Sequence, residues 1–293
     1  MSFFVIPTEP PQTASETNRA SRKFDWVGSI TGVSGLVLIN FAFNQAPLVG
    51  WKTYCPYLLV LGTIIFIGFI YVELNVAEQP LIPMRGLQKE AGFVLAVIGA
   101  GWASHGIWLF YMYSFLEIIR GLSPLHACAQ TCLVAFTGTS AALCVGPLLK
   151  RMRVAYVMTL AMIFFTVGTI LLVTTPVNQS YWAQTLLTVI IMPGGMNLSF
   201  PAGTLIMSNA LPREHQGIAA SMISTMVNYA ISTGLGVAGS IAVNIDPNDT
   251  NPLPAHRGAW YFALGLDIVG LFIALWFVWK TRPRVDADTS EPA

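Results

Sequence analysis

The stretch that decides the fold runs from Tyr181 to Val243 and reads YWAQTLLTVIIMPGGMNLSFPAGTLIMSNALPREHQGIAASMISTMVNYAISTGLGVAGSIAV. Two long apolar runs flank a short charged hinge, LPREHQG, at residues 211–217. Four helix-breaking residues interrupt the first run: Pro193, Gly194, Gly195 and Pro201. Proline would end or kink a helix in a water-soluble core, because it lacks the amide donor and clashes with the preceding turn. In a membrane such breaks persist where protein or water satisfies the freed backbone groups.

The interruption in the first run allows two interpretations. A Gly/Pro-interrupted apolar segment is the best sequence pointer to the binding site of a transporter. Glycine and proline are also commoner in membrane helices generally, so the same residues fit a packing kink that binds no ligand. Both interpretations remain open from the sequence.

The composition predicts an all-α integral membrane protein. Of 293 residues, 54% are hydrophobic and only 10% charged, with a mean hydropathy of +0.63. Soluble domains average about 25% charged residues, so this chain lacks the surface that a soluble fold needs. The net charge of +1 implies no attraction to nucleic acid. The metalloprotease, hydrolase and phosphate-loop signatures are absent, so we predict that the chain is not an enzyme, and nothing outside the spans indicates a cofactor.

The four cysteines lie in apolar runs and form no C-x-x-C pair: Cys55, Cys128, Cys132 and Cys144. A soft-metal site is conceivable at Cys128 and Cys132, which are one helical turn apart. We expect instead that all four are small, buried packing residues, and we predict no metal site.

Eight runs approach the roughly 20 residues that a membrane helix needs. The predicted spans are Trp26–Ala46, Tyr54–Val72, Gly92–Phe115, His126–Leu149, Val154–Val173, Tyr181–Ser208, Gly217–Val243 and Ala259–Trp279. The fold class is therefore a polytopic membrane helix bundle of about eight helices, with the lipid bilayer as its surroundings.

The basic residues predict the orientation of these spans. If the eight spans alternate, twelve of the fifteen Lys and Arg residues fall on the side of both chain termini. The three on the other side are Lys52, Arg120 and Arg257. An excess of Lys and Arg marks cytoplasmic loops, so both termini are predicted to be cytoplasmic. The sequons at Asn178 and Asn248 then lie in outer loops, where glycosylation is possible.

Two ionisable residues sit at membrane depth. His105, in GWASHGIWLFY, could relay protons or meet a cationic substrate; the alternative is a neutral imidazole bonded to a backbone carbonyl. Asp267, in FALGLDIVGLF, costs about 2.5–3.5 kcal/mol to insert, and its apolar neighbours outweigh that cost. We expect the Asp267 side chain to face protein, either protonated or paired.

Other polar groups also need partners inside the bilayer. The seventh span carries a small and polar stripe at helical spacing: Ser221, Thr225, Asn228, Ser232, Gly236 and Gly239. Such a face favours close helix contact, with cavity lining as the second interpretation. Gln130 and Asn197 are single polar residues in apolar surroundings.

Several motifs together resemble one family closely. They are FDWVGSITGVSGLVLINFAFNQAPLVGW, QPLIP, GWASHGIWLFY and IIMPGGMNLSFPAGTLIMSNALPREHQGIAAS. They are similar to the fungal fourteen-span drug:proton antiporters of the major facilitator superfamily, the aminotriazole-resistance type. GPLLKRMR at residues 146–153 resembles the degenerate C-half copy of the superfamily's loop motif.

The resemblance implies a domain plan. Residues 1–25 would be a cytoplasmic segment with the tail of a missing span, and residues 26–73 two inter-half helices. Residues 92–279 would form the C-terminal six-helix bundle, and 280–293 a cytoplasmic tail. The first six spans of the family have no counterpart here. The resemblance therefore implies that a missing N-terminal half is a partner of this chain. We expect the plasma membrane in preference to the vacuolar membrane.

The resemblance also implies roles for particular residues. The substrate-binding candidates are His105, Trp108, Tyr111, Asn197 and Ser199. The proton-coupling candidates are His105 and Asp267, although Asp267 falls on a helix that the family places at the periphery. The residues expected to face the other half are Gln130, Asn228 and Ser232.

The function implied is proton-coupled efflux of drugs or small molecules, with this chain as a C-terminal portion that is inactive alone. Two alternatives stay open. The chain could be a half-transporter that acts as a dimer, or a non-transporting scaffold or regulatory half that retains only the fold.

Overall fold

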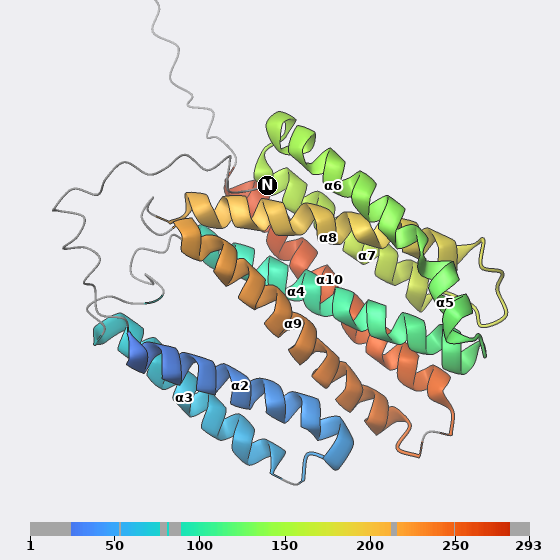
Figure 1. Ribbon diagram of the computed structural model, residues 1–293, viewed down its shortest axis with the longest axis horizontal. Helices are drawn as coiled ribbons and strands as arrows, with labels where there is room; N and C mark the ends of the chain where they lie inside the picture. The colour runs from blue at the N-terminus through green and yellow to red at the C-terminus, as the bar shows by residue number, and fades with distance from the viewer. Residues whose placement is uncertain are drawn as a thin grey trace, which may run out of the picture.

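The computed structural model describes residues 25–52, 54–76, 81, 89–211, 216–248 and 250–281. This part of the chain contains eight helical segments long and apolar enough to cross a membrane (Figure 1). The elements in chain order are α2 (Trp26–Val49), α3 (Cys55–Asn75), α4 (Lys89–Ser114), η3 (Phe115–Ile119), α5 (Pro124–Thr131), α6 (Leu133–Arg151), α7 (Val154–Val173), α8 (Gln184–Asn209), α9 (Gln216–Ile245) and α10 (Pro252–Lys280). The predicted all-α bundle of eight spans is confirmed.

Successive spans run in opposite directions, so one end of the bundle collects most of the described positive charges (Figure 1). We call this end the basic end; it carries Lys89, Lys150, Arg151, Arg153 and Lys280. The opposite end carries Lys52, Arg120 and Arg257. Residues 1–24 and 282–293, which hold most of the two predicted cytoplasmic segments, lie outside the described residues, as does most of the charged hinge between α8 and α9.

The core lies where α4, α7, α8 and α10 meet. Its largest fully buried side chains include Trp108, Phe165, Met192 and Trp260. By contrast, α6 has no buried residue and packs mainly on α8. The α2–α3 hairpin stands at the side of the bundle and contacts it through α9 (Figure 1).

Helices α2 and α9 run parallel and are joined by a polar seam. The Ser232 hydroxyl donates to Asn40 Oδ1 at 2.9 Å, and the side-chain amides of Asn40 and Asn44 donate to Thr233 and Ser232 at 3.2 and 3.1 Å. Such bonds hold helices together in lipid, where no water competes for them. Further along, Gly236 lies so close to Phe43 that an added Cβ would sit 2.7 Å from the Phe43 backbone.

Helix α8 is continuous through Pro193, Gly194, Gly195 and Pro201, so the predicted helix break is absent. The two glycines instead let the α8 backbone approach α7: an added Cβ would lie 2.9 Å from Phe164 at one position and 2.5 Å from Phe165 at the other. The Asn197 side chain donates to the Pro193 carbonyl at 2.9 Å. Close packing therefore accounts for the glycines.

The fourth predicted span is divided into α5 and α6 at Cys132. The Thr131 hydroxyl bonds the Ala127 and Cys128 carbonyls and contacts the Tyr113 hydroxyl at 2.6 Å, and such side-chain bonds bend helices. Along this segment the prediction of buried cysteines is wrong. Cys128, Cys132 and Cys144 are exposed, because they lie on α5, α6 and the turn between them, and only Cys55 is buried.

Candidate functional site

An aromatic row on α4 forms the centre of the candidate site. Trp102, His105 and Trp108 follow one another at intervals of three residues, so their side chains share one face of the helix. The His105 ring lies 5.7 Å from the Trp108 ring at an interplanar angle of 20°, and 5.6 Å from the Trp102 ring at 80°. The imidazole is thus stacked on one indole and edge-on to the other.

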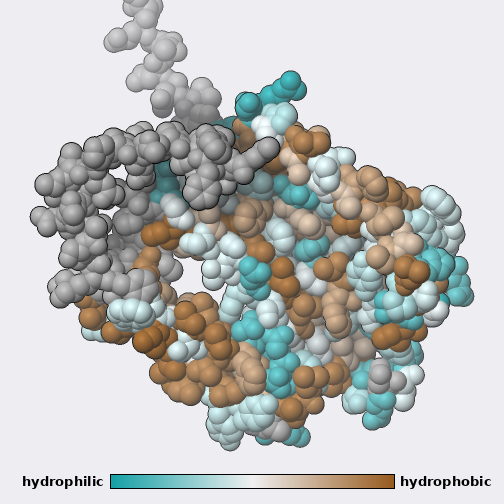
Figure 2. Space-filling model, viewed as in Figure 1, coloured by the Kyte–Doolittle hydropathy of each residue, from teal (hydrophilic) through white to brown (hydrophobic). Residues whose placement is uncertain are grey.

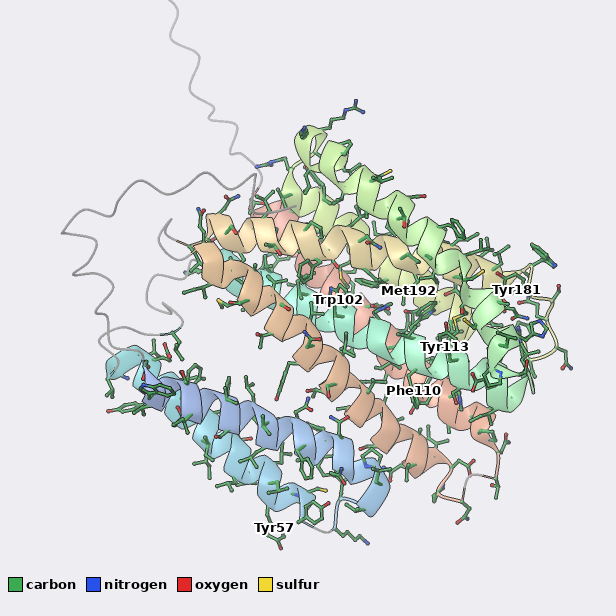
Figure 3. The ribbon with its side chains drawn as sticks, viewed as in Figure 1. Tyr57, Trp102, Phe110, Tyr113, Tyr181 and Met192 are labelled. Carbon is green, nitrogen blue, oxygen red and sulfur yellow. The ribbon has the colours of Figure 1, made fainter. Side chains whose placement is uncertain are left out.

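The indoles of Trp102 and Trp108 connect this aromatic row to α8 by hydrogen bonds. Trp102 Nε1 donates to Ser199 Oγ at 3.1 Å, and Trp108 Nε1 donates to Thr188 Oγ1 at 2.8 Å. The Thr188 hydroxyl in turn donates to the Gly168 carbonyl of α7 at 2.8 Å. In Figure 3, Trp102 and Met192 lie where α4 and α8 come together. The row therefore ties α4, α7 and α8 to one another.

His105 itself is held by rings rather than by hydrogen bonds. Its side chain is 6% exposed, and the Phe165 ring lies 6.1 Å away on a third side. The Nδ1 atom is buried without a hydrogen-bond partner among the described residues. The sequence alternative of an imidazole bonded to a carbonyl is thus not observed, and the ring keeps a free polar atom at membrane depth.

Asp267 forms the second part of the candidate site. Its side chain is fully buried, and Oδ2 accepts hydrogen bonds from Ser104 of α4 and Thr169 of α7, both at 2.7 Å. The Oδ1 atom has no partner in the described part of the chain. The expectation that this carboxyl faces protein is confirmed. Asp267 lies at the junction of α4, α7 and α10, which is more central than a peripheral helix suggests.

The two parts of the site meet on α4. Ser104, which holds Asp267, directly precedes His105, so consecutive residues of one helix contact the carboxyl and the aromatic row. A rotation or shift of α4 would change both environments together. The arrangement can therefore link the state of a buried acid to the position of the helix that carries the aromatic row.

The structure separates the other predicted substrate residues. Ser199 contacts the aromatic row through Trp102. Tyr111 lies nine residues after Trp102, which is half a turn out of phase, and its ring packs edge-on against His256 of α10 at 5.2 Å. The Asn197 amide faces α6, where Gly138 approaches it. The row thus combines His105, Trp108 and Ser199, while Tyr111 and Asn197 lie on other faces.

The three residues expected at the interface with another half occupy different positions. Ser232 is bonded to α2 of this chain. Asn228 is exposed on the same helix, α9. Gln130 lies on α5, where its carbonyl accepts from the Tyr181 hydroxyl at 2.7 Å. Only Asn228 therefore presents its side chain to a surface that this chain leaves uncovered.

The end opposite the basic end carries both predicted glycosylation sites. Asn178 lies between α7 and α8, and Asn248 between α9 and α10; both side chains are exposed. Nearby, Arg120 closes η3 by donating to the Val177 and Pro176 carbonyls and to Thr185, at 3.0–3.1 Å. Partial burial lowers the pKa of this guanidinium from its usual value.

Sequence reasoning missed three of the residues that build the site. Ser104, Thr169 and Thr188 are hydroxyl residues in apolar runs, and each bonds a side chain of another helix. Nothing in the local sequence distinguishes them from the many hydroxyls that bond their own helix backbone, as Thr166 does with Met162. The only available signal was the need of Asp267 for buried donors.

These features define a class of protein: a polytopic helical membrane transporter, with an acid and an imidazole buried at membrane depth. The Major Facilitator Superfamily model matches residues 109–293, and the chain belongs to this family. Its members are transporters and not enzymes, as predicted. A solved structure of the nucleoside transporter NupG, in its D323A mutant, supports the fold alone: the TM-score is 0.54 and the identity 14%, over 89% of this chain and 85% of that one.

Curated relatives come from fungi. The low affinity ammonium transporter of Saccharomyces cerevisiae is 47% identical over 291 residues, which is 99% of this chain and 56% of the relative. The efflux pump terJ of Aspergillus terreus is 39% identical, covering 94% of this chain and 53% of the pump. The aminotriazole resistance protein of Saccharomyces cerevisiae is 35% identical, covering 98% and 54%. The chain thus spans about half the length of these relatives.

Proposed function

We propose that this chain forms one half of a proton-coupled exporter of drugs or other small molecules. The observation that carries the proposal is the buried Asp267 carboxyl, held by Ser104 and Thr169 with Oδ1 unpaired. The efflux pump and aminotriazole resistance relatives support export as the direction. Ionisable residues inside membrane proteins mark proton relays and substrate paths by default.

The proposed coupling step depends on the unfavourable free energy of a charged carboxylate in a site from which water is excluded. With α4, α7 and α10 packed together, Asp267 is neutral when a proton occupies Oδ1, and the two hydroxyl donors satisfy Oδ2. When the helices separate and water reaches the carboxyl, the charged form is stabilised and the proton leaves. Because Ser104 precedes His105, this change also moves the aromatic row.

For the substrate path we propose the face of α4 and α8 that carries His105, Trp108 and Ser199, while Tyr111 and Asn197 lie on other faces of these helices. Aromatic rings and a free imidazole nitrogen suit flat or cationic organic molecules. In this family's alternating-access scheme, substrate binds between two halves that rock against one another. We therefore propose that a second six-helix half completes the site, with Asn228 on this chain's side, since Gln130 and Ser232 are bonded within this chain.

Transport of ammonium is a second candidate. The relative with 47% identity is named as an ammonium transporter, and the row of Trp102, His105 and Trp108 is a set of π-faces that a small cation could meet. Transport of radiolabelled methylammonium, measured beside drug export, would separate the two candidates.

The sidedness proposed is that both termini and the basic end are cytoplasmic. Asn178 and Asn248 would then be glycosylated outside the cell, with the plasma membrane as the location. A shift in gel mobility after glycosidase treatment, absent in Asn178→Gln and Asn248→Gln, would support this orientation. A protease-accessible tag at Asn248 on the cytosolic side would contradict it.

Transport is tested with the chain alone and with the chain joined to a second half. The chain is reconstituted by itself and as a fusion with the part of its 47%-identical relative that this chain does not match. We expect export to require both the fusion and a proton gradient. Export by the chain alone would favour a half-transporter that pairs with itself, and a fusion that folds without transport would favour the scaffold alternative.

Replacing Asp267 by Asn in the active fusion should abolish the response to a proton gradient. The amide oxygen can still accept from Ser104 and Thr169, so the packing is preserved while the titrating group is removed. We expect gradient-driven export to fall by about tenfold or more, which corresponds to about 1.4 kcal/mol of coupling. Counterflow exchange of labelled substrate, which needs no gradient, is the control and should persist.

Replacing His105 by Ala in the same fusion should change the pH dependence of export. The two indole nitrogens of the aromatic row are hydrogen-bonded, whereas His105 Nδ1 is buried without a described partner, so the imidazole is the group available to a proton or substrate. Export would be recorded between pH 5 and 8, the range in which an imidazole ordinarily titrates. An unchanged profile would retire His105 as a coupling residue and leave it as core packing.

A further inference from the structure

The buried face of α10 carries a second ionisable side chain besides Asp267. Four buried residues follow one another along this face at intervals of three or four: His256, Trp260, Ala263 and Asp267. With a rise of about 1.5 Å per residue, His256 lies roughly 16 Å from Asp267 along the helix, and Trp260 lies between them. The proposed coupling acid therefore shares a helix face with an imidazole that lies nearer the end opposite the basic end (Figure 1).

His256 is hydrogen-bonded at both ring nitrogens. The Pro252 carbonyl, 2.7 Å from Nδ1, can only accept, so Nδ1 carries a proton and donates it. The Ser114 hydroxyl of α4 lies 2.7 Å from Nε2 and can donate to a neutral ring or accept from a charged one. The rings of Tyr111 and Trp260 pack edge-on against the imidazole at 5.2 and 6.1 Å. His256 can thus gain and lose a proton at Nε2 while both ring nitrogens stay paired.

His256 lies near the start of α10, at an end of the bundle that water reaches. Figure 2 shows hydrophilic side chains gathered over the end where α5 lies and α10 begins. The charged residues of the elements that pack there are Glu117 of η3, Arg257 of α10 and Asp246 after α9, and all three are half-buried. A proton from the aqueous solution therefore has a short route to His256.

Two buried polar atoms on this face of α10 have no hydrogen-bond partner among the described residues. They are the Trp260 Nε1 donor and the Asp267 Oδ1 acceptor, and both side chains are fully buried. The indoles of Trp102 and Trp108, by contrast, each donate to a hydroxyl. Buried polar atoms that lack a protein partner are ordinarily satisfied by internal water, and an indole N–H suits a water oxygen.

Toward the basic end, the same face of α10 is closed by tight packing. An added Cβ at Gly270 would lie 2.5 Å from Met162 Cε of α7 and 3.1 Å from Ala100 Cβ of α4. Gly270 lies about one turn beyond Asp267, so packing at this level excludes water. Along this face, the polar groups that lead to the Asp267 carboxyl therefore lie on the side of His256.

We propose that His256 delivers protons to Asp267 from the end of the bundle opposite the basic end. This inference rests on the proposed function, in which Asp267 is the coupling acid. Nε2 of the neutral ring takes a proton from the aqueous solution, and the Ser114 hydroxyl turns to accept from the new N–H. The imidazolium passes this proton to a transient chain of water that Trp260 Nε1 orients. The Asp267 carboxylate accepts one proton at Oδ1, so the acid becomes neutral and the ring returns to its first state.

Infrared spectroscopy of the full chain in lipid nanodiscs tests this path. The C=O stretching band of the protonated Asp267 carboxyl is assigned by its loss in Asp267→Asn, and its hydrogen–deuterium exchange is followed after transfer to heavy water. His256→Asn, whose amide can still donate to the Pro252 carbonyl, should slow this exchange by about tenfold or more, because the proton acceptor is removed. Trp260→Phe removes the indole N–H, keeps an aromatic ring, and should slow the exchange by about threefold to tenfold.

Tyr261→Phe is the matched control, because it removes one hydroxyl from a neighbouring side chain of α10 that is 59% exposed. Its carboxyl should exchange as fast as that of the unsubstituted chain. Backbone amide exchange in the same spectra identifies a loosened variant, and the other of the two variants then decides. If the carboxyl exchanges at the unsubstituted rate in His256→Asn and Trp260→Phe, the path is wrong while the coupling role of Asp267 stands. If the unsubstituted chain shows no protonated Asp267 band, the proposed coupling fails and this path with it.

Discussion

Replacing Trp108 by Ala should lower the free energy of unfolding by about 3–5 kcal/mol. The indole is 2% exposed, stacks on His105, and donates to Thr188 at 2.8 Å. In lipid, the loss comes from missing packing contacts and one interhelical hydrogen bond, because burial from water contributes little to helix association there. Unfolding by sodium dodecyl sulfate in mixed micelles, followed by circular dichroism, measures the change.

Trp108→Phe is the matched control for this prediction. It keeps most of the ring volume and removes only the hydrogen bond to Thr188, so the loss should be about 1 kcal/mol. Leu109→Ala, at a neighbouring side chain that is 44% exposed, should change the unfolding free energy little. If Trp108→Ala unfolds at the same detergent fraction as the unsubstituted chain, Trp108 is not part of the core.

Replacing Gly236 by Val should detach the α2–α3 hairpin from α9. Even a Cβ at this position would lie 2.7 Å from backbone atoms of Phe43, and backbone cannot move aside as a side chain can. Overpacking of this kind costs about 1–3 kcal/mol, comparable with the polar seam that holds the hairpin. The readout is oxidative cross-linking of a Pro47→Cys/Gly239→Cys pair, because a Cβ at Gly239 would lie 3.3 Å from the Pro47 Cβ, close to disulfide distance.

The cross-linking yield should fall by about tenfold, equivalent to about 1.4 kcal/mol, in Gly236→Val. Gly68→Ala on α3 is the control, since an added Cβ there meets no atom within 4 Å. An unchanged yield in Gly236→Val would show that the hairpin is held in some other way.

Hydropathy predicts the spans well because the bilayer imposes a length on every helix. The predicted span Val154–Val173 coincides with α7, and the burial of Asp267 follows from its cost in lipid. The break at Cys132 and the π-helical segment η3 were not predicted, because they arise from side-chain contacts and not from local propensity.

The prediction of a helix break in α8 is wrong for a related reason. Glycine and proline mark either a break or a close approach, and only the position of α7 decides between them. The candidate site could be predicted in part: His105, Trp108 and Ser199 do lie together. Tyr111 does not join them, because nine residues place it on the opposite face of α4 from Trp102.

The attachment of Asp267 to two earlier helices has a consequence for biosynthesis. Helix α10 follows α4 and α7 in the chain, so Ser104 and Thr169 enter the membrane before the carboxyl that they bond has been synthesised. Until α10 is inserted, the two hydroxyls can bond only to each other, to water or to the backbone of their own helices. A ribosome stalled before Asp267 should therefore leave an assembly intermediate that quality-control proteases degrade faster than the finished bundle.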